Sequence, residues 1–174
     1  MAVQCRAKTA GGEGTVRGTR KIVSGAVLAL CIVSTGAPAL AEGSSKGYGV
    51  GGRFSRYYPV IRKYNKSGER FRIVGFCRSA CTLFLSIKNV CIERSAFLSF
   101  HAGPDNRTGK WGPNSSSTKK MLAAYKPALR RYLVKGGHVN SRRYFTMKGA
   151  TLIDKFGYVE CPAPKPPLPV RRGS

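Results

Sequence analysis

The chain has 174 residues, 42% of them apolar, and it carries 31 Lys and Arg against 7 Asp and Glu, a formal net charge of +24. This length is typical of one domain with a modest core. So few carboxylates argue against a calcium loop, a two-carboxylate glycosidase site or a magnesium cluster. A multi-spanning membrane protein is also excluded, because no uninterrupted run of 18 or more apolar residues occurs.

Residues 1–41 have the three parts of a secretory signal peptide. A basic stretch ends at Arg20-Lys21, an apolar stretch covers residues 22–33, and Ala39-Leu40-Ala41 is a small-x-small cleavage site. We expect cleavage after Ala41 and a periplasmic or secreted protein; the alternative is an uncleaved segment that anchors the protein in the inner membrane. The chain after this site has a net charge of +20. That charge predicts anionic lipids or envelope glycans as partners, and no specific nucleic acid.

Helices and strands are expected to alternate over residues 42–161, which is typical of an α/β domain. The elements expected in chain order are a helix over 54–64 ended by Gly68, a strand over 70–76, a short buried helix over 79–88, and strands over 90–93 and 96–101. After a loop over 102–117, the hydroxyl side chains at 115–118 should cap a basic helix over 119–135, which Pro127 should kink or split. A short helix around 141–147 and a return segment to Cys161 complete the domain. Residues 162–174 should form a disordered, polyproline-like tail.

The segment from Gly75 to Thr82 is the most informative, because a predicted strand passes through small residues into a helix with Ser79 at the junction. Such a turn raises a hydroxyl group and leaves the first N–H groups of the helix unpaired. A nucleophilic serine needs both, since the N–H groups can stabilise the oxyanion. His101, at the end of a predicted strand, is the natural general base. The alternatives are a plain helix N-cap for Ser79 and a packing role for His101.

These residues resemble the proteolytic subunit of Clp protease and the crotonase-like superfamily, and more closely the small exported proteobacterial proteins with a Ser-Ala-Cys-Thr motif. Gly51-Gly52 stands at the oxyanion-loop glycines of that family, Ser79-Ala80 at its nucleophile and the next residue, and His101 at its catalytic histidine. The resemblance implies a small, truncated domain of that fold, with a short, mostly parallel sheet flanked by helices. It also implies an oxyanion hole formed by the backbone N–H groups of Gly52 and Ala80.

The third catalytic residue of that family, an aspartate, has no counterpart, because it would fall near Arg143. Asp105 and Asp154 are the candidates to replace it, and Gly51-Gly52 has a second interpretation as a flexible leader. The function predicted is an exported, peptidase-like serine hydrolase that acts on a peptide or acyl substrate without a cofactor. The alternative is a catalytically silent domain of the same fold that binds anionic envelope components through its basic surface.

Four cysteines remain after the expected cleavage site, and an even number in an exported chain predicts disulfides. Sequence alone allows three pairings. We favour Cys77–Cys81, which would brace the turn around Ser79, and Cys91–Cys161, which would fix the end of the domain to a core strand. The alternative is a four-cysteine zinc site, but only one cysteine pair has the close spacing of structural zinc sites, so no metal is expected.

Overall fold

The structure is a computed structural model that describes residues 42–163, so the expected signal peptide and residues 164–174 of the tail lie outside the described range. Over that range the chain forms a mixed α/β domain with two small sheets. Its elements, in which η denotes a 3₁₀ helix, are β1 (Gly43–Ser44), η1 (Phe54–Arg56), α1 (Tyr58–Ser67), β2 (Phe71–Ile73), β3 (Phe76–Arg78), η2 (Ser79–Ser86), β4 (Val90–Ile92), β5 (Phe97–Phe100), α2 (Ser116–Ala123), α3 (Pro127–Lys135), β6 (Phe145–Lys148) and α4 (Gly149–Phe156).

The strands form two three-stranded sheets where the sequence predicted one. The first sheet has the order β1-β2-β4 and is entirely parallel. The second has the order β3-β5-β6, in which β3 and β5 are parallel and β5 and β6 are antiparallel. The strand predicted over 70–76 passes from one sheet to the other at Gly75, whose φ of +57° lets the chain turn sharply. The mixed α/β class is therefore confirmed, whereas the single sheet is wrong.

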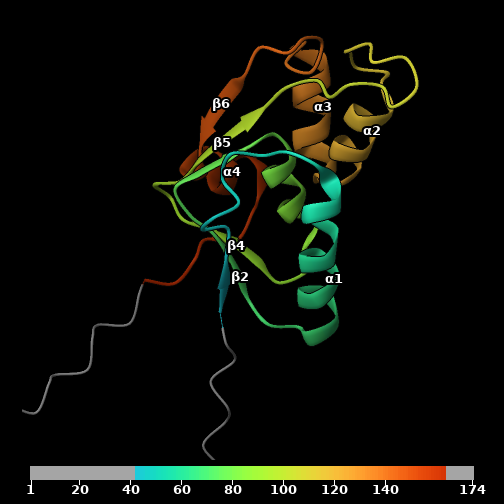
Figure 1. Cartoon of the computed structure of the whole chain (residues 1–174). Helices are drawn as coiled ribbons and strands as arrows, with labels where there is room; N and C mark the ends of the chain where they lie inside the picture. The colour runs from blue at the N-terminus through green and yellow to red at the C-terminus, as the bar shows by residue number, and fades with distance from the viewer. Residues whose placement is uncertain (1–41, 164–174) are drawn as a thin grey trace, which may run out of the picture. The chain divides into compact units, whose positions relative to one another are not determined.

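Helices α1, α2 and α3 lie on the same side of the strands (right-hand side of Figure 1). The predicted 119–135 helix is split, because α2 ends at Ala123 and Pro127 begins α3, where the missing proline N–H costs no helical hydrogen bond. The Thr118 N–H donates to Ser115 Oγ at 3.2 Å, which makes Ser115 the N-cap of α2. Gly68 ends α1 with a φ of +73°. These local predictions are confirmed.

The helix predicted around residues 141–147 is wrong. The chain there forms strand β6, which pairs with β5 so that Met147 stands opposite Leu98. Both side chains are buried, and the hydroxyl oxygens of Ser99 and Thr146 lie 2.8 Å apart across the pair. Cross-strand packing with β5 therefore decides the conformation, not the local sequence pattern. The return segment also contains α4, which the sequence analysis did not predict.

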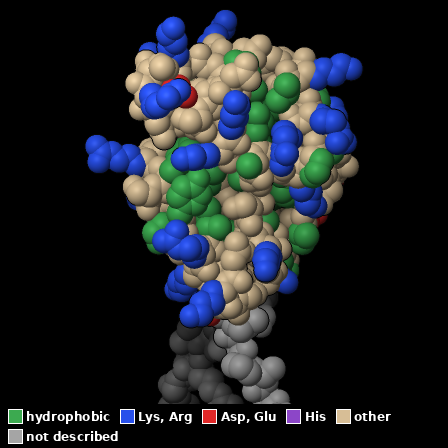
Figure 2. Space-filling model, turned by 90° about the vertical axis from the view of Figure 1, so that its right-hand side faces the viewer, with side chains coloured by type: hydrophobic (Ala, Val, Ile, Leu, Met, Phe, Trp, Pro, Cys, Tyr) green, Lys and Arg blue, Asp and Glu red, His purple; other side chains and the backbone are tan. Residues whose placement is uncertain are grey.

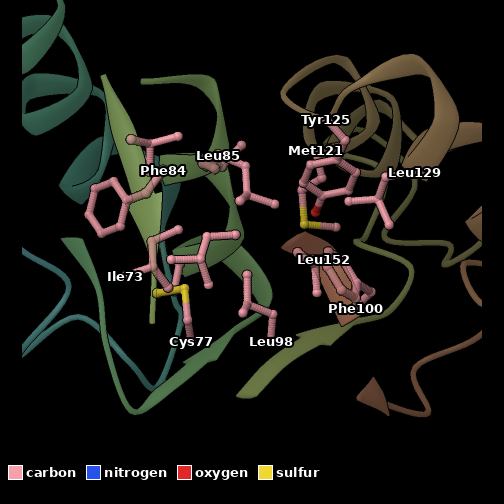
Figure 3. Packing of buried hydrophobic residues seen from close by; sticks show 14 of the residues in the cluster. Ile73, Cys77, Phe84, Leu85, Leu98, Phe100, Met121, Tyr125, Leu129 and Leu152 are labelled. Carbon is pink, nitrogen blue, oxygen red and sulfur yellow. A yellow bond between two sulfur atoms is a disulfide. The ribbon is translucent and has the colours of Figure 1, made fainter. Parts of the chain in front are cut away.

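The hydrophobic core lies between the strands, η2 and the helices. The η2 residues Ala80–Leu85 are all buried, which explains why this helix is apolar on every side. Figure 3 shows Met121, Tyr125 and Leu129 next to Phe100, and the rings of Tyr125 and Phe100 have their centroids 5.3 Å apart. Fully burying one side chain of this size stabilises the fold by about 1.5–3 kcal/mol.

Both predicted disulfides are present, Cys77–Cys81 with 5.2 Å between the Cα atoms and Cys91–Cys161 with 4.8 Å. The end of the domain also pairs with β4, because the Ile92 N–H donates to the Val159 carbonyl at 2.9 Å and the Cys161 N–H donates to the Ile92 carbonyl at 3.0 Å. Two disulfides are compatible with an extracellular or periplasmic protein. Among residues 42–163 there is no helix of the length and apolar character that a bilayer crossing requires.

Candidate functional site

Ser79 occupies the sharp turn between β3 and η2. Its φ of +54° makes it the only non-glycine residue with a positive φ in the described part of the chain. Such a conformation costs about 1–3 kcal/mol, which the surrounding contacts must offset. The N-cap position of η2 belongs to Arg78, and no side chain makes a capping hydrogen bond there. The interpretation of Ser79 as a plain N-cap is therefore wrong, and its hydroxyl makes no hydrogen bond to another described residue.

A disulfide and a side-chain hydrogen bond hold this turn, and a second hydrogen bond holds the side chain that makes the first. The Cys77–Cys81 disulfide encloses Ser79, and Thr82 Oγ1 donates to the Ser79 carbonyl at 2.6 Å. Thr82 Oγ1 also lies 2.5 Å from the Tyr125 hydroxyl, which must be the donor because the Thr82 proton is already used. Burial raises the pKa of Tyr125, so the phenol keeps its proton. Neither residue was predicted to belong to the site. The position of Thr82, three residues after Ser79, was a local signal for this contact, whereas Tyr125 is too distant in the sequence to give one.

Gly51 packs directly against the Ser79 turn. A Cβ atom at Gly51 would lie 2.8 Å from both the Arg78 carbonyl oxygen and Ser79 Cβ, closer than real Cβ atoms come. The loop before it follows β3, since the Arg78 N–H donates to the Gly49 carbonyl at 2.9 Å. Gly51 is buried and has a φ of +81°. A flexible leader is therefore the wrong interpretation of this glycine, which fills a place that no larger residue fits.

The N–H groups of Gly52 and Ala80 belong to the residues that follow Gly51 and Ser79, and neither donates a backbone hydrogen bond in the part of the chain that the structure describes. Ala80 lies in the first turn of η2, where N–H groups have no partner within the helix. Gly52 follows Gly51 with a φ of +126°. Unpaired backbone N–H groups are the kind of donor that an oxyanion needs.

His101 reaches the same end of the second sheet as Ser79. Arg78 pairs with Ser99, so Ser79 lies one residue beyond this pair on its strand and His101 two residues beyond it on the neighbouring strand. Adjacent strands are about 4.8 Å apart. His101 is 7% exposed as a residue, and neither ring nitrogen has a hydrogen-bond partner. The hydrogen bond between Ser79 and His101 that a catalytic dyad needs is therefore not formed here.

Two loops cover the His101 ring. Trp111 stacks on it with 5.8 Å between ring centroids, and Tyr144 meets it edge to face at 4.7 Å. The Arg142 guanidinium carbon lies 4.5 Å from the centroid of the Trp111 ring. Burial lowers the pKa of His101 below its usual range, and the charge of Arg142 acts in the same direction. The imidazole is therefore neutral at neutral pH, the form in which it can accept a proton.

Neither candidate acid is bonded to His101. The Asp105 carboxylate accepts hydrogen bonds at 3.1–3.2 Å from three backbone N–H groups, those of Arg107, Thr108 and Ser116. These bonds lower the pKa of Asp105 to about 2. The carboxylate therefore stabilises the backbone of its own loop. Asp154 lies on α4 and pairs with Arg94 at 2.8 Å. In the described structure, the aromatic rings of Trp111 and Tyr144 pack against the His101 ring, and neither candidate carboxylate reaches it.

A cleft of about 500 Å³ opens beside Gly52. The segment from Arg53 to Tyr58 forms one wall, and Pro104, Asn106 and the start of α2 form the other. Among the described residues, no three or more His, Cys, Asp or Glu side chains are grouped so that they could hold a metal ion. All four cysteines are in disulfides, so the alternative zinc site has no thiolates to use.

The described residues define a disulfide-braced α/β domain with a strained serine and a covered histidine at one sheet end. No protein-family model, curated protein or solved structure matches the chain significantly. The function must therefore be argued from this geometry. Chemically, the arrangement offers a hydroxyl nucleophile, donors for an oxyanion and a neutral imidazole.

Proposed function

We propose that the protein is an exported serine hydrolase that transfers acyl groups through Ser79. The observation that carries the proposal is the strained conformation of Ser79, at a strand-to-helix turn and with no hydrogen bond to its hydroxyl. Nucleophilic serines in hydrolases occupy turns of this kind, which expose the hydroxyl group. The sequence resemblance to the Clp protease and crotonase-like families supports the same assignment of Ser79, Ala80, Gly52 and His101.

In the proposed reaction, Ser79 Oγ attacks the substrate carbonyl carbon while His101 accepts the hydroxyl proton. The N–H groups of Gly52 and Ala80 stabilise the oxyanion, and the leaving group departs with the proton from His101. Water then attacks the acyl-enzyme by the same route and releases the acid. Because no carboxylate orients the imidazole, we expect slow turnover, and a dyad that aligns only when substrate binds.

The proposal includes export by the signal peptide predicted over residues 1–41. The two disulfides support an oxidising compartment. Mass spectrometry of the exported protein should find Glu42 as its first residue. A full-length product that stays in the membrane would instead support the anchored alternative.

A fluorophosphonate probe tests the catalytic proposal, because it forms a covalent bond only with an activated serine. The oxidised protein should be labelled at Ser79, and Ser79→Ala should lose the label. Ser86→Ala is the matched control, since this exposed serine lies at the far end of η2 and donates only to the Leu83 carbonyl. His101→Gln should be labelled more slowly. A folded wild-type protein that is not labelled would overturn the proposal.

A silent polyanion-binding domain is the second candidate, and the distribution of ion pairs favours it. In the described structure all five ion pairs involve one of three arginines, Arg70, Arg72 and Arg94. Figure 2 shows the face on the side of the helices, where Lys and Arg side chains surround apolar ones and acidic side chains are sparse. Binding to anionic vesicles or glycans should fall steeply with salt, because screening acts over about 10 Å at 0.1 M. Binding that ignores salt would contradict this candidate.

A further inference from the structure

The cleft beside Gly52 is built from donors and aromatic rings. Arg53 and Lys120 line it from opposite walls, and Phe54 and Tyr58 add an apolar wall whose ring centroids are 6.1 Å apart. None of the residues that line it is acidic. A ligand that fits this lining has an apolar stem and an anionic end.

The two cationic side chains that line the cleft are available to bind an anion. Within residues 42–163, neither Arg53 nor Lys120 forms an ion pair, because every ion pair there involves Arg70, Arg72 or Arg94. Asn106, which also lines the cleft, accepts a hydrogen bond from Ser117 through Oδ1 at 3.3 Å. Its side-chain amide N–H groups therefore remain available to donate. The Arg53 guanidinium, the Lys120 ammonium group and the Asn106 amide can therefore donate to a carboxylate, whereas the Ser117 hydroxyl already donates to Asn106.

The cleft adjoins the proposed site at Gly52, while Ser79, Ala80 and His101 do not themselves line it. It begins at Gly52, whose N–H is one of the two proposed oxyanion donors, and it continues to Pro104, three residues after His101. An acyl chain whose carbonyl group lies at Gly52 can extend between Phe54 and the start of α2. Its far end then meets Lys120.

We infer that this cleft selects acyl groups that carry a carboxylate, an inference that rests on the proposed function of Ser79. The apolar stem of the acyl group lies against Phe54 and Tyr58, and its carboxylate binds Arg53 and Lys120. Two sources share this chemistry, a small dicarboxylic half-ester and the acidic side chain of a peptide. Partly exposed ion pairs of this kind change binding by about two- to fivefold each.

Paired esters test the selectivity. The glutaryl and pentanoyl p-nitrophenyl esters have acyl chains of equal length and differ only in the terminal carboxylate. We expect a kcat/KM at least fivefold higher for the glutaryl ester at low salt, and a two- to fivefold loss of this preference in Arg53→Gln or Lys120→Gln. Arg62→Gln is the matched control, because this exposed residue of α1 does not line the cleft. The N-acetylglutamyl and N-acetylglutaminyl esters repeat the comparison for a peptide side chain and separate the two sources.

Binding of glutarate to Ser79→Ala, followed by NMR, gives a readout that needs no catalysis. Glutarate should shift the signals of the cleft residues, and Lys120→Gln should weaken this binding by the same two- to fivefold factor. Turnover without preference for the carboxylate would overturn the inference and leave the proposed function standing. Glutarate binding in the cleft without labelling or turnover would overturn the function and keep the binding site. Loss of both results would overturn both.

Discussion

Replacing Gly51 with alanine tests whether the glycine loop shapes the serine turn. The new Cβ would lie 2.8 Å from the Arg78 carbonyl oxygen and from Ser79 Cβ, so one of the two backbone segments must move. The φ of +81° adds strain to any residue with a side chain. Gly51→Ala should therefore displace the Ser79 turn as well as destabilise the fold.

The size of the effect follows from two contributions. An alanine with a left-handed φ costs about 1–2 kcal/mol. Forcing an extra carbon into a packed site adds about 1–3 kcal/mol, which gives a total of about 2–5 kcal/mol. Gly68→Ala is the matched control, because its φ of +73° is similar but a Cβ there meets nothing within 4 Å. Gly68→Ala should therefore cost only the strain of the left-handed φ, about 1–2 kcal/mol.

Urea unfolding and fluorophosphonate labelling measure the two consequences separately. Gly51→Ala should unfold at a lower urea concentration than Gly68→Ala, and under conditions where both are folded it should be labelled at least tenfold more slowly. If the two variants lose the same stability and are labelled alike, Gly51 does not shape the site, and the argument from its contacts with Ser79 fails.

Two further predictions concern the disulfides and the histidine. The chain-entropy contribution of a disulfide grows with the logarithm of the number of residues in the loop that it closes. Removing Cys91–Cys161, with a sequence separation of 70, should therefore cost about 4 kcal/mol, and removing Cys77–Cys81, with a separation of 4, about 2 kcal/mol. Equal losses of stability for the two double-alanine variants in urea unfolding would contradict this. In the folded protein the pKa of His101 is below its ordinary value of 6.5, so the unfolded chain binds more protons. The contribution of neutral His101 to stability is therefore present above pH 6.5 and should be lost as the pH falls through the folded pKa. Labelling of Ser79 should be constant above pH 6.5 and slow below the folded pKa, and a rate that rises on acidification would show that neutral His101 is not the base.

Local sequence signals predicted much of this fold because the residues involved act on their own backbone. Pro127 has no N–H to continue a helix, Ser115 accepts a hydrogen bond within its own turn, and Gly68 adopts a left-handed φ. Strand β6 was missed because its conformation depends on β5, more than 40 residues earlier. The same distinction applies to the site, where Ser79 stands out locally but its contact with Gly51 exists only in the folded chain.

His101 shows why the rest of the site could not be predicted. The sequence marks it as a histidine at a strand end, and nothing in the pattern indicates that Trp111 and Tyr144 cover its ring. A buried polar group without a partner costs about 1–3 kcal/mol, and the positive φ of Ser79 costs a similar amount. Packing alone explains neither cost, since an apolar side chain would suit the covered site and a glycine would suit the turn. Both costs fall at the same end of the second sheet, and natural sequences break local rules of this kind mainly where function requires it.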